Sequence, residues 1–299
     1  IGGSGFTGGE LCRLLLKHKN IKNIFPTSRG NQSFQRVHPN LIGSNLNFVN
    51  IKSIIEKRNV DVIFLCTKSS QSIEYAEIFA KRKILVIDLS GAFRFKSPKN
   101  YFKAYGKEHA NKELLKFASY GATEFNLSKI KKTSLIANPG CYALCALLSL
   151  APLTKEKFID FKKNIKIHAI NGTTGAGATL RKEISHENAT ENMLAYNAMG
   201  HRHAPEIEEK LDNLFNVKNA CVDLNTAHGN FRRGIFMQTS LELIKNFKGK
   251  MSRNILIKKY KKFYKDKKIH NFILINDFER TGEKNDKDYL IYPQLNNVI

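Results

Sequence analysis

Cys141 is the residue in this sequence whose setting most favours covalent chemistry. It follows an Asn-Pro-Gly turn (residues 138–140) that separates the short apolar run 135–137 from the apolar helical run 143–153. A thiol at the start of a helix lies at the positive end of the helix dipole, which lowers its pKa and raises its thiolate fraction. Such a thiolate can attack an acyl carbon while backbone N–H groups stabilise the oxyanion. The turn therefore predicts Cys141 as a nucleophile toward an activated carboxyl group.

Two histidines that flank an arginine, His201 and His203, precede a helix predicted over residues 208–215. Imidazole titrates near neutral pH and suits proton transfer. Glu206, three residues after His203, is placed to orient that imidazole, as the third group of a nucleophile–base–orienter site does. The spacing leaves open which histidine is the acid/base. An H-x-H pair supplies too few ligands for zinc, so we expect no metal site.

Glycines at positions 2, 5 and 8 precede an apolar-periodic helical run, residues 10–17. Such glycines let the backbone approach a pyrophosphate, and the helix N-terminus that follows presents free N–H groups. An ordinary glycine-rich loop is the alternative interpretation. The expected cofactor contacts in this segment are Gly2, Ser4, Gly5, Phe6, Thr7 and Gly8.

The residues after a second predicted strand, 23–27, indicate which dinucleotide binds. The strand is interrupted by Pro26 and ends at Ser28 and Arg29. In dinucleotide-binding folds an acidic residue here holds the ribose 2′-OH, whereas an arginine accommodates a 2′-phosphate. Because no acid is nearby, Ser28 and Arg29 favour NADP(H) over NAD. A surface arginine in a basic protein is the competing interpretation.

Apolar strands alternate with helices through the first half of the chain. Strands are expected at 61–66 and 84–89, with a helix at 72–81 between them. This pattern predicts an α/β fold, a doubly wound Rossmann-type nucleotide domain over residues 1–140. Ligands bind beyond the carboxyl ends of such strands, so Arg94, in the loop after the second strand, is a candidate substrate-binding residue.

Beyond residue 153 the pattern changes, and a second domain is expected over residues 141–299. A strand is predicted at 165–170. A second glycine-rich segment follows it and includes Gly175, Ala176 and Gly177. The chain length of 299 residues accommodates two domains of ordinary size.

Composition narrows the compartment and the partners. The formal charge is +23, but only 12 of the 49 basic residues are arginine, and the densest stretch, 258–268, keeps its aromatic residues at helical spacing. We therefore expect a solvated lysine face, no nucleic acid and an anionic small-molecule substrate. No apolar run is long enough for a membrane span. The five cysteines form no CxxC pair, which favours the reducing cytoplasm.

Taken together, the motifs GGSGFTGGEL, DLSGAFR, NPGCY, GTTGAGA, HRHAPEI and FRRGI make the chain resemble the type 1 N-acetyl-γ-glutamyl-phosphate reductases of arginine biosynthesis. The resemblance covers essentially the whole chain. It implies an NADPH-dependent reduction of an acyl phosphate through a Cys141 thioester. His203 would be the acid/base, assisted by Glu206, and His201 and Arg94 would contact substrate. Gly175, Ala176 and Gly177 would lie near the nicotinamide.

The resemblance also implies an architecture: a nucleotide domain and an α+β substrate domain whose sheet builds an oligomer interface, in a homodimer or homotetramer. The family's first strand and its C-terminal helix are expected to be missing from this sequence, which we interpret as a fragment. Aspartate-semialdehyde dehydrogenase and aminoadipyl-phosphate reductase share the chemistry and are the nearest alternatives. A non-catalytic basic binding protein or remnant is the alternative from another class.

Overall fold

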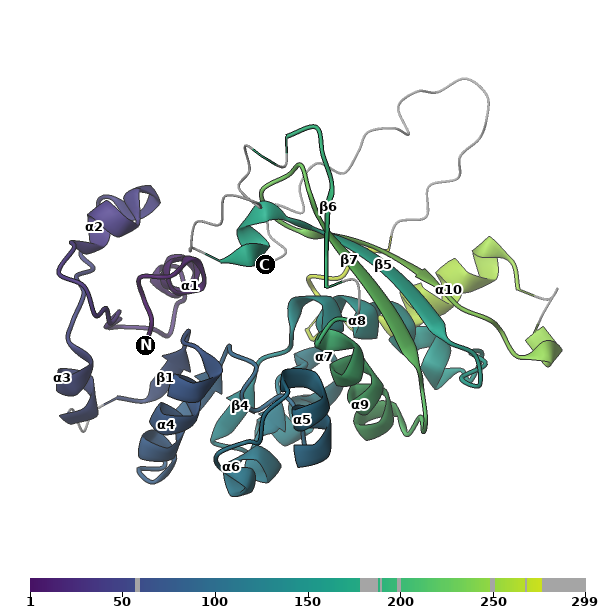
Figure 1. Ribbon diagram of the computed structural model, residues 1–299, viewed down its shortest axis with the longest axis horizontal. Coiled ribbons are helices and arrows are strands. Elements are labelled where there is room, and N and C mark those ends of the chain that lie inside the picture. The colour runs from purple at the N-terminus through teal and green to yellow at the C-terminus, as the bar shows by residue number, and fades with distance from the viewer. Residues whose placement is uncertain are drawn as a thin grey trace. The chain divides into compact units, whose positions relative to one another are not determined.

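The structure is a computed structural model that describes residues 1–56, 60–177, 188, 190–197, 200–247, 251–266 and 268–275 (Figure 1). The chain separates into two compact units, and each is described by itself. The first unit comprises Ile1–Cys141 and Thr174–Ser185. The second unit comprises Tyr142–Thr173 and His186–Ile299.

The first unit is built on a parallel sheet in the order β1-β2-β4-β3. Its strands are β1 (Val62–Leu65), β2 (Leu85–Asp88), β3 (Ser119–Tyr120) and β4 (Leu135–Ala137). Its helices are α1 (Phe6–Leu16), α2 (Phe34–Val37), α3 (Ile51–Glu56), α4 (Ser69–Ala80), α5 (Pro98–Tyr105), α6 (Lys112–Phe117) and α7 (Thr123–Ile130), with a 3₁₀ turn η1 (Pro39–Leu41). This confirms the predicted α/β class with a parallel sheet.

The N-terminal residues extend this sheet beyond β1. The amide of Cys66 donates to the Ile1 carbonyl at 2.9 Å, and the amide of Gly3 donates to the Thr27 carbonyl at 2.8 Å. Thr27 in turn forms a parallel bridge with Val49. The segment 1–3 therefore lies between β1 and Thr27, the position from which a glycine-rich loop reaches a bound dinucleotide.

Two element boundaries in the first unit differ from the sequence prediction. The strand expected at 23–27 is reduced to the single bridge at Thr27, because Pro26 has no N–H to donate to a ladder. The first helix begins at Phe6, not at residue 10, so Gly8 is inside it. There the absence of a side chain is required, since a Cβ on Gly8 would lie 2.4 Å from the Gly2 carbonyl oxygen.

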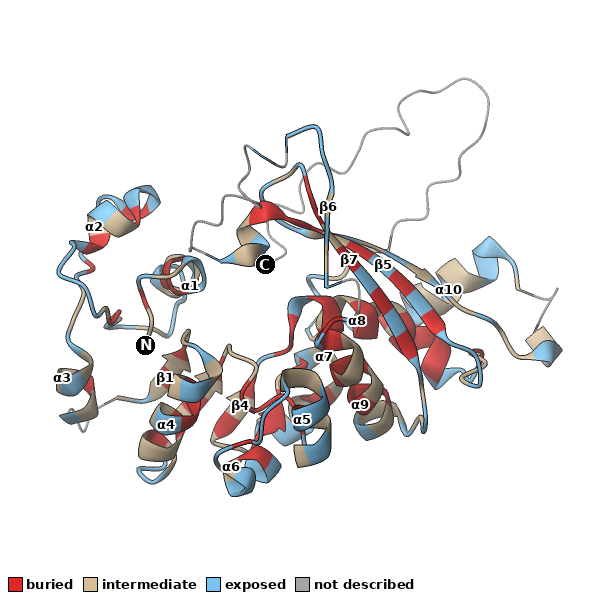
Figure 2. Cartoon of the chain, viewed as in Figure 1, coloured by how far each residue is buried: buried red, intermediate tan, exposed pale blue. Residues whose placement is uncertain are grey.

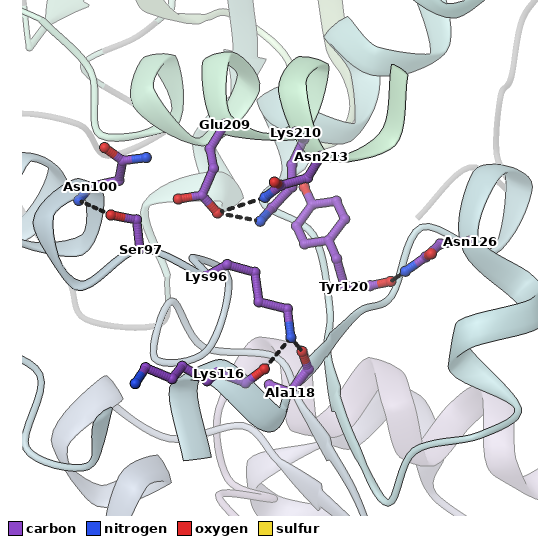
Figure 3. Close-up of polar contacts among 10 residues, drawn as sticks. All are labelled: Lys96, Ser97, Asn100, Lys116, Ala118, Tyr120, Asn126, Glu209, Lys210 and Asn213. Carbon is purple, nitrogen blue, oxygen red and sulfur yellow. Dashed lines mark hydrogen bonds and ion pairs between the residues drawn. The ribbon is translucent and has the colours of Figure 1, made fainter. Parts of the chain in front are cut away.

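The core of the first unit lies along the central strands (Figure 2). Alternate residues of β1 and β2 are buried, as expected for strands covered by helices. Ala76 and Phe79 of α4 are fully buried and belong to the same cluster. The short strand β3 is tied to α7 by Asn126, whose Nδ2 donates to the Tyr120 carbonyl at 2.8 Å (Figure 3).

The second unit contains a mixed sheet in the order β6-β7-β5-β8. Its strands are β5 (Ile165–Gly172), β6 (Leu194–Tyr196), β7 (Val222–Gly229) and β8 (Ile235–Ser240). Its helices are α8 (Cys141–Lys155, whose first residue belongs to the first unit), α9 (His203–Phe215) and α10 (Arg253–Phe263), with the 3₁₀ turn η4 (Lys245–Phe247). The 3₁₀ turn η2 (Thr173–Ala176) has its first residue in the second unit and the other three in the first. Strands β5 and β7 are parallel, and the other two pairings are antiparallel.

This sheet has one buried face and one open face. Residues alternate between buried and exposed along β5 and β7, so Ile165 and Ile167 face the interior while Lys166 and His168 face outward. On the same outward face, Phe236 of β8 stands opposite Ile170 in the register and is 62% exposed. The open face is thus part polar and part apolar.

Helix α10 confirms the interpretation of the lysine-rich stretch. Tyr264, just after the helix, is buried and donates its hydroxyl to the Leu148 carbonyl of α8 at 2.5 Å, and Tyr260 makes the same kind of bond to Ser149. The exposed residues of this stretch include Lys258, Lys261, Lys262, Lys265 and Lys268.

None of the helices in the described ranges combines the length and the apolar composition that a membrane span requires.

Helix α9 begins at His203, five residues earlier than the sequence suggested. Pro205 therefore lies within the first turn, where a missing backbone N–H costs no helical hydrogen bond. Near it, Lys210 is buried with its Nζ 2.7 Å from the Glu209 carboxylate, to which Asn213 also donates at 3.2 Å (Figure 3).

Candidate active site

Cys141 is the first residue of α8 and its side chain is exposed. Three residues separate it from the last residue of β4, so it stands at the carboxyl end of the first unit's sheet. The turn before it is tied to the neighbouring strand, because the Asn138 amide donates to the Asp88 carbonyl at 2.8 Å. This placement combines access for a substrate with the helix N-terminus that favours a thiolate.

Arg94 also contacts the turn at residues 138–140. It is buried, and its Nε donates to the Asn138 carbonyl at 3.0 Å while its Nη2 donates to the Leu89 carbonyl at 3.2 Å. The sequence suggested a substrate contact for Arg94. The structure shows contacts that brace the backbone on the approach to Cys141.

Asp88 supports this arrangement from the end of β2. Its carboxylate is fully buried and accepts from both the amide and the hydroxyl of Ser90, at 3.1 and 2.9 Å. Burial raises the pKa of the Asp88 carboxyl above its ordinary value, while the bonds from Ser90 and the charge of Arg94 oppose that rise. The loop after β2 is therefore shaped by a buried polar network.

The glycine-rich loop fits a dinucleotide. Gly2 has a positive φ of 82°, and a Cβ there would lie 2.4 Å from the Cys66 carbonyl oxygen. Gly5, the N-cap of α1, is different, since a Cβ there would meet nothing closer than the Gly2 oxygen at 3.7 Å. No side chain caps the N-terminus of α1. Open space above an uncapped helix N-terminus is what a pyrophosphate requires.

The other cofactor candidates follow from this loop. Ser28 and Arg29 come directly after Thr27, which bonds to Gly3, so they lie beside the glycine-rich loop, and Arg29 is exposed. Ser4, Phe6 and Thr7 are exposed at the start of α1. The other glycine-rich segment forms η2 and ends at Gly177, whose φ is 93°.

In the second unit, His203 and Glu206 lie together in the first turn of α9. Both side chains are buried, Glu206 fully, and the His203 Nε2 is 3.9 Å from the Glu206 Oε2. That separation is within ion-pair reach when the imidazole is protonated. The sequence-predicted partnership of these two residues is thus geometrically available.

His201 has a different environment from His203. Its Nδ1 accepts the backbone N–H of His203 at 3.1 Å, which leaves the proton of the neutral ring on Nε2. Burial, aided by the charge of Arg202, lowers the pKa of His201 to about 4. At neutral pH His201 is therefore an uncharged hydrogen-bond donor.

Four further residues, which the sequence did not single out, form a set of contacts that reaches the histidines through Tyr142 and Tyr196. Tyr142 of α8 donates to Asn171 Oδ1 of β5 at 2.6 Å, and its hydroxyl lies 2.7 Å from that of Tyr196 in β6. The Tyr196 ring stacks on His228 of β7 with 4.3 Å between centroids. Only the position of Tyr142 next to Cys141 hinted at a role; the other three come from strands that the fold assembles.

The remaining cysteines support the choice of Cys141. Burial raises the pKa of Cys66 to about 11 and also raises the pKa of Cys12. Cys145 is half-buried in α8, and Cys221 is exposed. Among the described residues, no three His, Cys, Asp or Glu side chains gather in a way that could hold a metal ion.

Two family matches together cover nearly the whole chain. The semialdehyde dehydrogenase NAD binding domain matches residues 1–133, and the semialdehyde dehydrogenase dimerisation domain matches residues 141–290. The N-acetyl-gamma-glutamyl-phosphate reductase of Campylobacter jejuni is 38% identical over 272 residues, which are 90% of this chain and 77% of that protein. The chain belongs to this reductase family.

Other members of the family are equally similar. The N-acetyl-gamma-glutamyl-phosphate reductase of Caldicellulosiruptor bescii is 38% identical over 273 residues, 89% of this chain and 76% of that protein. That of Methanococcus maripaludis is 37% identical over 272 residues, with the same coverage.

Solved structures of related enzymes share the fold of the family. Aspartate semialdehyde dehydrogenase II of Vibrio cholerae, complexed with ASA, superposes with a TM-score of 0.62 at 13% identity, over 89% of this chain and 77% of that one. The aspartate semialdehyde dehydrogenase of Candida albicans with NADP gives 0.60 at 11% identity, over 89% and 75%. At such low identity the likeness shows the fold alone.

Proposed function

We propose that this chain reduces N-acetyl-γ-glutamyl phosphate to N-acetylglutamate semialdehyde with NADPH, in arginine biosynthesis. The observation that carries the proposal is the exposed Cys141 at the start of α8, followed directly by Tyr142, whose ring contacts both His201 and His203. The names of the relatives, at 37–38% identity, support the substrate.

Cys141 is the proposed nucleophile. Its thiolate attacks the acyl carbon, a C–S bond forms, and the C–O bond to phosphate breaks, so that phosphate leaves with the electron pair. When bound, NADPH supplies the hydride that reduces the thioester carbonyl. The resulting thiohemiacetal anion re-forms the carbonyl as its C–S bond breaks, so the semialdehyde is released and the electron pair of that bond passes to the Cys141 sulfur, which takes up a proton.

His203 is the proposed acid/base of that last step, and it donates a proton to the departing Cys141 sulfur. Glu206 beside it stabilises the imidazolium form. His201 is unsuited to this task because its pKa of about 4 leaves it neutral. We assign His201 instead to the substrate, to whose oxygen atoms its Nε2–H would donate.

The cofactor contacts are proposed as the sequence suggested. Gly2 to Gly8 hold the pyrophosphate, Ser28 and Arg29 the 2′-phosphate, and Gly175 to Gly177 lie near the nicotinamide. Arg29→Ala tests the choice of cofactor. We expect its preference for NADPH over NADH to fall by about tenfold or more, because a charged bond to phosphate is lost. An unchanged preference would contradict the assignment of Arg29.

The central experiment follows NADPH oxidation by the chain with N-acetyl-γ-glutamyl phosphate. Cys141→Ser should abolish turnover, since a hydroxyl is far less ionised than a thiol. Cys221→Ser is the matched control, because Cys221 is also an exposed cysteine, and it should turn over normally. Near-normal turnover by Cys141→Ser would refute the thioester mechanism.

Substrate choice is tested by comparison. Turnover on N-acetyl-γ-glutamyl, β-aspartyl and aminoadipyl phosphates separates the proposed activity from those of the nearest chemical relatives. We expect kcat/KM to be highest for the first. A non-catalytic basic binding protein would turn over none of them, and its retention on a nucleic-acid column would fall with salt.

We also propose that the chain forms a homo-oligomer through the open face of its second sheet, and that it works in the cytoplasm. The matched dimerisation domain and the exposed Phe236 on that face support the first point. The five free thiols support the second. Phe236→Glu should lower the mass measured by light scattering, and an unchanged mass would place the interface elsewhere.

A further inference from the structure

Tyr142, the residue next to the nucleophile, contacts both histidines of the second unit. Its ring is almost fully buried. The ring centroid lies 5.1 Å from that of His201 at an interplanar angle of 83°, and 5.8 Å from that of His203 at 62°. The two histidine rings lie 4.6 Å apart. Any movement of the Tyr142 ring would therefore displace both imidazoles.

The hydrogen bonds of Tyr142 have a defined direction. Asn171 Nδ2 donates to the Gly172 carbonyl at 3.0 Å, so its Oδ1 is the atom that faces Tyr142. A phenol has one proton, and Tyr142 gives it to that oxygen. The bond between the two tyrosine hydroxyls must then run from Tyr196 to Tyr142. The sequence of donors is Tyr196, Tyr142, Asn171.

Tyr196 anchors the start of the segment that carries the histidines. Thr226 Oγ1 donates to its carbonyl at 2.8 Å, and its ring stacks on His228 at an interplanar angle of 13°. From Tyr196 the chain runs to His201 through Gly200, whose φ of 121° suits only glycine. Tyr196 is thus held by β7 and by Tyr142, and its ring centroid lies 5.9 Å from that of His201.

We propose that Tyr142 and Tyr196 are positioning residues, whose hydroxyl pair sets the placement of His201 and His203 for catalysis. The inference rests on the proposed function in so far as these histidines serve that reaction. The bond between the hydroxyls links Tyr196 of β6 to Tyr142, which directly follows Cys141. It therefore couples the placement of the acid/base to that of the nucleophile's own helix.

The donor order makes the two tyrosines unequal. Tyr196→Phe removes the bond between the hydroxyls and leaves Tyr142 bonded to Asn171. Tyr142→Phe removes the bond between the hydroxyls and also the bond to Asn171. We therefore expect a smaller effect from Tyr196→Phe than from Tyr142→Phe, although both rings remain.

The test measures kcat and KM for both variants in the full chain. Misplacement of a proton donor slows chemistry more than binding, so kcat should fall by about 10- to 100-fold while KM changes by less than about threefold. Tyr264→Phe is the matched control, since it also removes a buried hydroxyl bonded to α8 but lies against Leu148, and its kcat should stay near wild type.

A second readout does not depend on turnover. In histidine-labelled protein, the ring resonances of His201 and His203, assigned with single-histidine variants, should shift in Tyr142→Phe and Tyr196→Phe and stay in place in Tyr264→Phe. If wild type reduces none of the three acyl phosphates, the proposed function fails and these resonances alone decide the positioning role. Unshifted resonances would then overturn it.

If the wild-type protein is active, an unchanged kcat in both tyrosine variants overturns the proposal, whether or not their melting temperatures change. If Tyr142→Phe does not fold, Tyr196→Phe decides, because it keeps the bond to Asn171. A fall in kcat with shifted histidine resonances in Tyr196→Phe supports the proposal. A rise in KM alone assigns the tyrosines to substrate binding and overturns it.

Discussion

The backbone N–H of His203 donates to Nδ1 of His201 at 3.1 Å, and this bond gives the two histidines different chemistry. Burial, together with the charge of Arg202, keeps His201 neutral, whereas His203 has a carboxylate 3.9 Å from its ring. The H-R-H spacing left the choice between them open, and this difference supports our proposal that His203 is the acid/base.

The low pKa of His201 predicts a pH-dependent stability. The pKa of His201 is about 4 in the folded chain and 6.5 ordinarily, so at a pH between these values the unfolded chain binds a proton that the folded chain does not bind. The free energy of unfolding should therefore decrease as the pH falls from about 6.5 to about 4, by roughly 3 kcal/mol from this group. His201→Asn, whose amide oxygen can still accept the His203 amide, should lose that part of the dependence. Urea denaturation at several pH values measures the free energy of unfolding. The same pH dependence of that free energy in wild type and His201→Asn would contradict the prediction.

Two glycines of the cofactor loop should respond differently to alanine. In Gly8→Ala the new Cβ would lie 2.4 Å from the Gly2 oxygen. That strain costs about 1–3 kcal/mol and outweighs the gain of roughly 1 kcal/mol in helix propensity, so we expect a lower melting temperature.

In Gly5→Ala the Cβ has room, with its nearest neighbour at 3.7 Å, and the φ of −83° suits alanine. Stability should hold, but the Kd for NADPH should rise by about tenfold or more as the space for pyrophosphate is filled. Calorimetry and fluorescence titration check both, and equal NADPH affinity in Gly5→Ala and wild type would argue against this loop as the cofactor site.

Arg94 should affect the rate of the reaction through the backbone that it braces. Arg94→Lys keeps the positive charge near Asp88 but cannot reproduce the fork that reaches both the Leu89 and Asn138 carbonyls. We expect kcat to fall by about tenfold with a smaller change in KM, because a shift of the turn displaces Cys141. Arg94→Met should in addition lose about 2–4 kcal/mol of stability, since it removes the charged hydrogen bonds to the Asn138 and Leu89 carbonyls. A variant in which only KM rises would return Arg94 to the substrate contact suggested by the sequence.

Thiol reactivity should separate the cysteines. At pH 7.5 roughly 0.1% or less of Cys66 is thiolate, given its pKa of about 11, and Cys12 is also buried. Iodoacetamide should therefore label Cys141 and Cys221 before these two, as measured on tryptic peptides. In urea all of them should react. Rapid labelling of Cys66 in the folded protein would show that its surroundings are open to solvent.

Local sequence predicted several features of this protein because they depend on a few neighbouring residues. Strand β4 coincides with the apolar run 135–137, and α8 starts at the cysteine that the Asn-Pro-Gly turn precedes. The glycine-rich start, the alternation of strands and helices, and the motif order were enough to identify the α/β class and the family. Such features follow from backbone freedom and hydrophobic periodicity, which are properties of short segments.

Tertiary structure decided what those residues do to one another. The sequence presents Tyr142, Asn171, Tyr196 and His228 as unrelated positions, because hydrogen bonds between α8 and three strands arise only when the sheet forms. It presents Arg94 as a candidate substrate-binding residue, whereas in the folded chain its guanidinium donates to two backbone carbonyls. It also cannot distinguish His201 from His203, since a pKa depends on desolvation and nearby charge. Short segments determined which groups the chain carries, and packing determined their protonation, their orientation and their partners.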